Sequence, residues 1–84
     1  MVTVRVFGTF RLISGVKRLE IEPTSVQELF ELVLEEAKRI KPDSKLTVKD
    51  VKSCMVVVNG KRVKSNAALC DGDEVMLVPA SGGG

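Results

Sequence analysis

The part of this chain whose residue types could support chemistry is its end, Pro79-Ala80-Ser81-Gly82-Gly83-Gly84, which follows the apolar run Val75 to Val78. This tail has no apolar side chain larger than alanine, so we expect it to project into solvent as a flexible segment. Glycine has no Cβ, and six extended residues reach about 20 Å. The terminal carboxylate of Gly84 could therefore enter a deep, narrow pocket on another protein. Taken alone, the same composition is also typical of a linker.

The remaining side chains offer little catalytic chemistry. The chain has no histidine, so it cannot build a Ser-His or Cys-His nucleophile, and no carboxylate pair occupies a recognisable acid–base setting. Its two cysteines, Cys54 and Cys70, cannot make a disulfide scaffold or a structural zinc site. We expect both to be small buried hydrophobic residues, and we expect neither a metal site nor a self-contained enzyme.

Length and composition indicate one small globular domain. The 84 residues are 44% apolar and 29% charged, and the net charge of +2 is too small to indicate nucleic-acid binding. We expect two basic clusters, 61–64 and 38–41, to be solvated faces. Met1 is followed at once by a strand pattern, and no apolar run approaches membrane length, so we expect a cytoplasmic protein with no membrane contact.

The first part of the chain predicts a β-hairpin. Residues 2–6 alternate with the period of a strand that has one strongly apolar face, and residues 17–22 alternate again. Between them we expect an irregular connection that ends in a turn at Ser14-Gly15.

A helix should follow Pro23. Ser25 and Glu28 have capping-box spacing, with Thr24 and Gln27 as an alternative register. Apolar residues then recur at helical spacing until Pro42 stops the helix, and we expect them to face the core: Val26, Leu29, Phe30, Val33, Ala37 and Ile40.

The last part predicts three strands. Residues 43–53 fit either a short strand or a helical turn, and 55–58 form a continuous apolar run typical of a strand covered on both faces. Asn59-Gly60 favours a tight type I′ turn into a short polar strand, and a turn at 71–74 leads into a final strand. We expect an α+β domain over residues 1–78, with one helix on a mixed four- to five-stranded sheet, and a tail over 79–84. One core should contain Val4, Val6, Leu29, Phe30, Val33, Val57, Val75 and Leu77.

This order resembles the MoaD/ThiS family of ubiquitin-like sulfur carriers, which have the β-grasp fold. The resemblance rests on Phe7-Gly8 after the first strand, Asn59-Gly60, the Asp-Gly-Asp-Glu-Val turn at 71–75, and the terminal glycines. The length and Phe7-Gly8 are more similar to the small subunit of molybdopterin synthase than to the shorter carriers of thiazole synthesis. The chain departs from the family in having Pro79-Ala80 instead of two prolines, and three terminal glycines instead of two.

The resemblance implies a carrier that acts through its partners. An E1-like adenylating enzyme of the MoeB/ThiF type would use ATP and magnesium to activate the Gly84 carboxylate, and a sulfur donor would convert it to a thiocarboxylate. Ser81, Gly82 and Gly83 would lie in the partner's channel, and a large molybdopterin synthase subunit of the MoaE type would use the sulfur. No cofactor would bind the chain itself. Activation is needed because a carboxylate of pKa about 3.3–3.7 is an anion at neutral pH and a poor electrophile.

Three alternatives remain open at this point. The chain could be a protein modifier joined through Gly84 to a target lysine, as in archaeal ubiquitin-like proteins. It could supply sulfur for the thiazole of thiamine. It could also be a β-grasp interaction domain with an inert tail.

Overall fold

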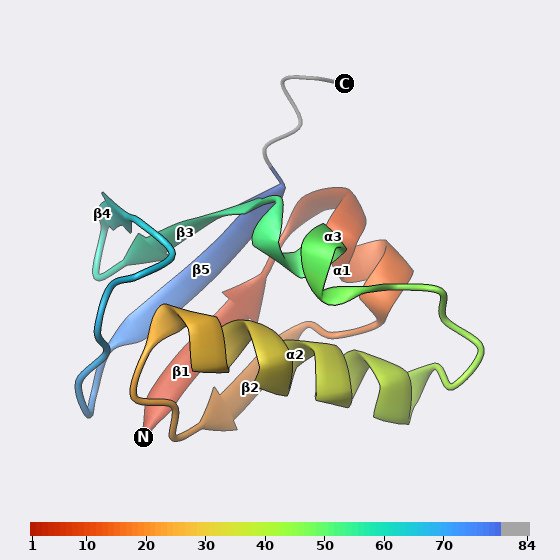
Figure 1. Ribbon diagram of the computed structural model, residues 1–84, viewed down its shortest axis with the longest axis horizontal. Helices are drawn as coiled ribbons and strands as arrows, with labels where there is room; N and C mark the ends of the chain where they lie inside the picture. Colours follow the sequence, from red (N-terminus) through yellow and green to blue (C-terminus); the bar gives the residue numbers. More distant parts are fainter. Residues whose placement is uncertain (80–84) are drawn as a thin grey trace.

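The computed structural model describes residues 1–79, which form five strands and three helices (Figure 1). In chain order these are β1 (Val2–Val6), α1 (Gly8–Ser14), β2 (Arg18–Ile21), α2 (Val26–Ile40), α3 (Val48–Lys52), β3 (Cys54–Val58), β4 (Lys61–Val63) and β5 (Glu74–Pro79).

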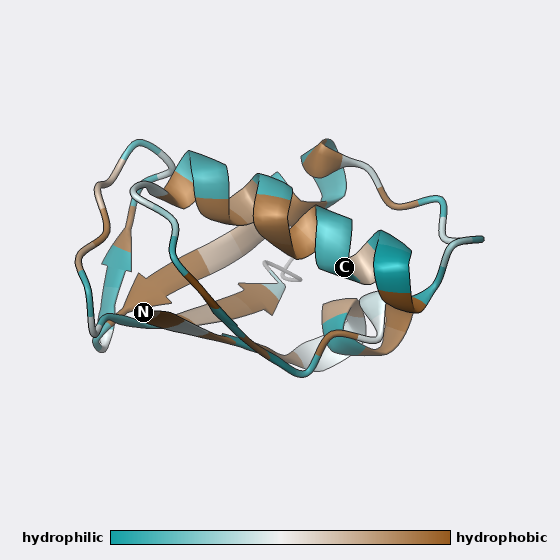
Figure 2. Cartoon of the chain, turned by 90° about the horizontal axis from the view of Figure 1, so that it is seen from below, coloured by the Kyte–Doolittle hydropathy of each residue, from teal (hydrophilic) through white to brown (hydrophobic). Residues whose placement is uncertain are grey.

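The strands form one mixed sheet in the order β2-β1-β5-β3-β4. β1 and β5 are parallel, with Val4 beside Val75, and the other neighbouring pairs are antiparallel. The last strand in the sequence is therefore the central strand of the sheet. α2 lies across one face of this sheet, with hydrophobic residues toward the strands (Figure 2). This is the β-grasp arrangement that the family resemblance implies, and it agrees with the α+β domain that the sequence pattern predicts.

α2 forms as its pattern requires. The Ser25 Oγ accepts a hydrogen bond from the Glu28 N–H at 3.2 Å, and the Glu28 carboxylate accepts one from the Thr24 N–H at 2.9 Å. The cap therefore uses the Ser25–Glu28 register. The predicted apolar positions are buried except the last, Ile40, which is 41% exposed at the end of the helix.

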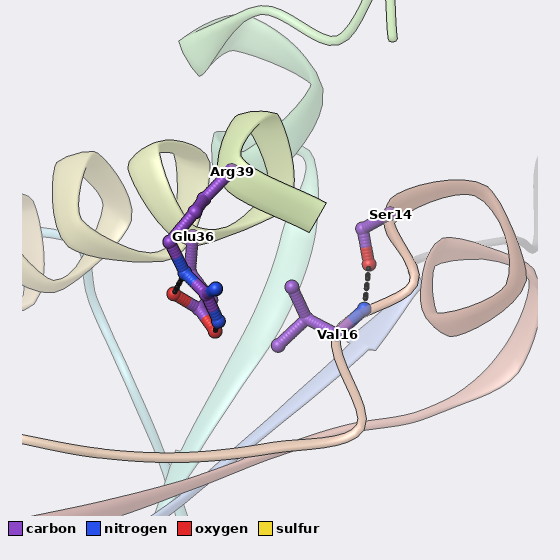
Figure 3. A network of polar contacts seen from close by, with 4 residues as sticks. All are labelled: Ser14, Val16, Glu36 and Arg39. Atoms are coloured by element: carbon purple, nitrogen blue, oxygen red, sulfur yellow. Dashed lines mark hydrogen bonds and ion pairs between the residues drawn. The ribbon is translucent and has the colours of Figure 1, made fainter. Parts of the chain in front are cut away.

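The connection between β1 and β2 is helical, whereas an irregular hairpin loop was expected. α1 buries Phe10 and Ser14, which are one helical turn apart, and exposes Leu12 and Ile13. The helix ends at Gly15, whose φ of 77° is left-handed, as a glycine after a helix allows. The buried Ser14 hydroxyl oxygen accepts a hydrogen bond from the Val16 N–H at 3.1 Å, which satisfies it inside the core (Figure 3).

Two further outcomes concern the second half of the chain, where the sequence leaves one segment open between a short strand and a helical turn. The ambiguous segment contains the short helix α3, which begins with a capping box between Thr47 and Asp50. The expectation that β3 is covered on both faces is wrong, because the helices cover only one face: Val56 is buried there, and Val57 is half-buried on the other face. The other predicted core residues are buried together. The Asn59-Gly60 turn has the two positive φ values of type I′, 50° and 85°.

Candidate functional site at the base of the C-terminal tail

The four residues predicted to carry the function, Ser81, Gly82, Gly83 and Gly84, lie outside the residues that the structure describes. What the structure describes is the base of the tail, where β5 ends at Pro79, one residue beyond the strand end expected from the sequence. The candidate site therefore consists of the residues that fix the position and direction of Pro79.

Backbone pairing holds the end of β5 on both sides. Cys54, the first residue of β3, lies opposite Pro79 in the antiparallel register. On the other side, the Phe7 N–H donates a hydrogen bond to the Leu77 carbonyl at 3.0 Å, just beyond the parallel pairing with β1. Pro79 has no N–H to donate, and it stands at the last position of the strand, where proline is tolerated. The chain therefore leaves the middle of the sheet from a fixed point.

Gly8 packs against Pro79 more closely than any other residue type could. Its φ is 67°, and a Cβ built on it would lie 2.9 Å from Cγ and 3.0 Å from Cδ of Pro79. The missing side chain lets the first turn of α1 lie directly against the proline ring. Gly8 thus positions the base of the tail. The sequence alone did not reveal this role, because Phe7-Gly8 served there only as part of the family resemblance.

Cys54 lies beside the tail base but is poorly suited to carry sulfur. Burial raises the pKa of its thiol, and the nearby negative charge of Asp50 raises it further. The thiol is therefore protonated at neutral pH and a weak nucleophile. The expectation that both cysteines are buried holds for Cys54 and is wrong for Cys70, which is exposed near the turn before β5.

The other end of β5 is fixed by polar contacts. Asp73 accepts hydrogen bonds from the Cys70 N–H at 2.8 Å and from the Asn59 side-chain amide at 2.9 Å, and these bonds hold the pKa of Asp73 below its usual value. The Asn59 side-chain oxygen, Oδ1, in turn accepts a hydrogen bond from the Glu74 N–H at 2.9 Å. The Asn-Gly turn and the acidic turn therefore lock together where β5 begins.

Two further features are absent from the described residues, 1–79. These residues contain no group of three or more His, Cys, Asp or Glu side chains placed to hold a metal ion. Within the same residues, no helix has the length and apolar character needed to cross a membrane.

Comparison with known families matches residues 4–84, nearly the whole chain with its tail, to the model of the ThiS family. The chain belongs to the ThiS family. The match includes Phe7-Gly8, the Asn-Gly turn and the terminal glycines that carry the resemblance in the sequence. The chain is thus a member of the ubiquitin-like ThiS/MoaD sulfur carriers, which are small carrier proteins.

Solved structures of similar proteins agree with this ThiS-family assignment. A protein of Pyrococcus furiosus assigned as molybdopterin converting factor subunit 1 is 28% identical, with 93% of this chain and 94% of that protein covered and a TM-score of 0.67. Subunit 1 in a complex of subunits 1 and 2 of the molybdopterin-converting factor from Helicobacter pylori is 26% identical, with 99% and 97% covered and a TM-score of 0.61. Small archaeal modifier protein 1 of Methanosarcina acetivorans, at 21% identity, 99% and 95% coverage and a TM-score of 0.72, shares the fold. A search of curated proteins gives no match.

Proposed function

We propose that this protein carries sulfur as a thiocarboxylate on Gly84 and donates it in the synthesis of molybdopterin. The observation that carries the proposal is the match of the ThiS family through residue 84, on a chain whose central strand ends just before the tail. In this scheme Ser81, Gly82 and Gly83 form the thin segment that enters a channel on the partner.

The chemistry divides between the chain and its partners. A carboxylate oxygen of Gly84 attacks the α-phosphorus of ATP on an E1-like enzyme, and pyrophosphate leaves with the bonding electron pair. Magnesium on that enzyme offsets the phosphate charge. A donor then delivers sulfur at the oxidation level of sulfide to the carbonyl carbon, and AMP leaves. The chain supplies the carboxylate and its positioning, and binds no cofactor of its own.

The molybdopterin role draws its support from the similar proteins. The Pyrococcus furiosus protein and the Helicobacter pylori complex both belong to molybdopterin-converting factors, and both exceed 25% identity over nearly the whole chain. The two-subunit complex supports a second partner for this chain, a large synthase subunit of the MoaE type. The free, exposed thiol of Cys70 favours action in a reducing cytoplasm.

ATP–pyrophosphate exchange with the cognate adenylating enzyme tests the mechanism. Gly83→Val adds a β-branched side chain to the thin segment, and one residue appended after Gly84 moves the carboxylate away from the phosphate. Each change should lower exchange by about a hundredfold, the cost of a misplacement of about 1 Å, while binding to the enzyme weakens only modestly. Normal exchange by the lengthened chain would rule out the terminal-carboxylate mechanism.

Mass spectrometry of the protein isolated from its host tests the sulfur assignment. We expect the C-terminus to carry sulfur in place of one oxygen. Isopeptides between Gly84 and lysines would instead show a protein modifier, and an unmodified chain would favour the inert-tail alternative. The Cys54→Ala/Cys70→Ser variant should be loaded as well as the wild type, because the sulfur resides on the terminal carbonyl carbon. Loss of loading in this variant, with folding unchanged, would contradict that step.

A further inference from the structure

A basic groove lies beside the base of the tail, between β4, the end of α3 and the start of α2. Its volume is about 460 Å³, and the residues that line it include Phe30, Cys54 and Val63. Lys52, Arg62 and Lys64 line it, and no acidic residue does. We call this site, defined by Lys52, Cys54, Arg62, Val63 and Lys64, the β4 groove.

The positive charge of the β4 groove is uncompensated within the part of the chain that the structure describes. All three cationic side chains are exposed. The ion pairs in residues 1–79 join Met1 to Asp71 and Arg39 to Glu36, and none uses a cation of the groove. Three like charges around one hollow repel one another, and negative groups supplied by a partner would offset this repulsion.

The opposite edge of the molecule carries the opposite charge. A groove of about 430 Å³ between β2 and α2 is lined by Glu22, Glu28, Glu31 and Glu35, with no basic residue. The small net charge of +2 therefore does not reveal that opposite charges gather in two separated regions. The basic surface of the β4 groove is confined to one edge of the molecule, and this limited extent matches a short acidic peptide segment. The small net charge does not indicate nucleic-acid binding.

The β4 groove is continuous with the base of the tail. Two residues that line the groove pair with the end of β5: Cys54 pairs with Pro79, and Met55 pairs with Val78. A protein that takes the tail into a channel must lie against this end of the sheet. β4 is also an edge strand, paired only with β3 among the described residues, so its outer backbone groups can accept an added strand.

We propose that the β4 groove docks an extended, acidic segment of the adenylating enzyme that receives the tail. This inference rests on the proposed function and adds to it the charge and the conformation of the partner's contact. The carboxylates of that segment would contact Lys52, Arg62 and Lys64 while its backbone lies along β4. Docking so close to Pro79 would aim the tail at the partner's channel before any chemistry occurs.

A matched pair of charge-reversal variants tests the proposal. Arg62→Glu/Lys64→Glu alters the groove, and Lys17→Glu/Lys38→Glu makes the same change in net charge at exposed positions elsewhere. The measurement is ATP–pyrophosphate exchange with the cognate adenylating enzyme across carrier concentrations, at about 50 to 300 mM salt. We expect the groove variant to raise KM by about tenfold or more with little change in kcat, and to weaken the salt dependence of KM. The control variant should behave as the wild type.

The outcomes separate this inference from the proposed function. Exchange by the wild type together with an unchanged KM in the groove variant would overturn the docking site and leave the carrier mechanism intact. Equal increases in KM for both variants would also overturn it, because they would show long-range attraction without a defined contact. Absence of exchange with the wild type would instead count against the proposed function.

A binding experiment that needs no ATP gives a second measurement. The probe is a peptide of ten glutamates, followed by NMR on the labelled full chain, with a single-stranded oligonucleotide of ten nucleotides for comparison. We expect the peptide to shift backbone amides along 52–56 and 61–65 and to leave those near Lys17 and Lys38 unchanged. Shifts spread over all lysines would overturn the proposal. Shifts at the groove with the oligonucleotide and none with the peptide would replace it with nucleic-acid binding.

Discussion

The two ends of β5 are held by different kinds of contact. Where the strand begins, Asn59, Asp73 and the Cys70 backbone form a connected set of hydrogen bonds. Where it ends, Pro79 is held by close packing against Gly8 and by its place beside Cys54. Hydrogen bonds at an exposed turn stabilise the fold by modest amounts and still allow the turn to move. Atoms packed as closely as van der Waals contact allows, as at Pro79, instead fix the direction in which the chain leaves the strand. We therefore expect the first end to contribute mainly stability and the second mainly the aim of the tail.

The largest effect should come from Phe30→Ala, which removes a large side chain from the core on which both ends of β5 pack. Phe30 is 1% exposed and lies in one cluster with Val75 and Leu77. We expect the free energy of unfolding to fall by about 3–5 kcal/mol, the usual cost of truncating a buried phenylalanine. The measurement is chemical denaturation. Leu12→Ala, at a side chain that is 74% exposed, is the control and should change stability by less than about 0.5 kcal/mol. A melting temperature unaffected by Phe30→Ala would show that the core is wrongly assigned.

The next prediction compares two glycine variants to distinguish the cost of backbone strain from the cost of crowded packing at the tail base. Gly8→Ala and Gly72→Ala both place a side chain at positive φ, but an added Cβ at Gly72 meets no atom within 4 Å. We expect Gly72→Ala to cost about 1–2 kcal/mol of stability through strain, and Gly8→Ala to cost about 1–3 kcal/mol more through the contact with Pro79. Denaturation curves of the two variants give this difference directly.

The same pair should differ more in function than in stability. Gly8→Ala displaces Pro79, so pyrophosphate exchange should fall by about a hundredfold, whereas Gly72→Ala should exchange normally. Adding Pro79→Ala to Gly8→Ala removes the clashing ring atoms and should recover part of the lost stability. Equal exchange by the two glycine variants would refute the positioning role of Gly8.

A smaller effect is expected at the first end from Asn59→Gly. This change removes the two side-chain hydrogen bonds to Asp73 and Glu74 and keeps a residue that tolerates the φ of 50°. We expect a loss of about 1–2 kcal/mol with unchanged exchange, assayed well below the melting temperature. A marked loss of exchange in the folded variant would mean that the two ends are coupled.

The smallest effect is a pH dependence from Asp73, whose folded-state pKa is lowered by its hydrogen bonds from Cys70 and Asn59. A lowered pKa stabilises the fold above the ordinary value of 3.8, and this contribution is lost as the pH falls through the folded-state value. The wild type should therefore exceed Asp73→Asn in stability at neutral pH, and the difference should shrink below about pH 4. Denaturant titrations across this range give the comparison, and a constant difference would contradict it.

The sequence predicted the elements that have strong local signals. α2 has both a cap and a long apolar stripe, and Asn59-Gly60 specifies its turn through backbone angles alone. α1 was missed because its seven residues bury only Phe10 and Ser14, too few to establish a helical period. The run 55–58 has no alternation, so it could not show that Val56 faces the helices and Val57 does not.

The site was harder to predict because it depends on contacts between distant parts of the chain. The terminal glycines indicated where the chemistry should occur. The contact between Gly8 and Pro79 arises only when β1 and β5 pair in parallel, and local patterns do not encode such a contact. Lys52 lies near Arg62 and Lys64 because the β3–β4 hairpin folds the basic stretch 61–64 back beside the end of α3.

The central place of β5 also has a consequence for how the protein is made. β1 and β3 both pair with this strand, so neither half of the sheet can join the other until residues 74–79 have left the ribosome. β1 can pair with β2 early, but its pairing with β5 must wait until residues 74–79 are made, and such long-range pairing slows folding. A nascent or truncated chain lacks the joined sheet on which a partner would dock. Under the proposed function, activation would therefore be restricted to folded molecules in which β5 has paired on both sides.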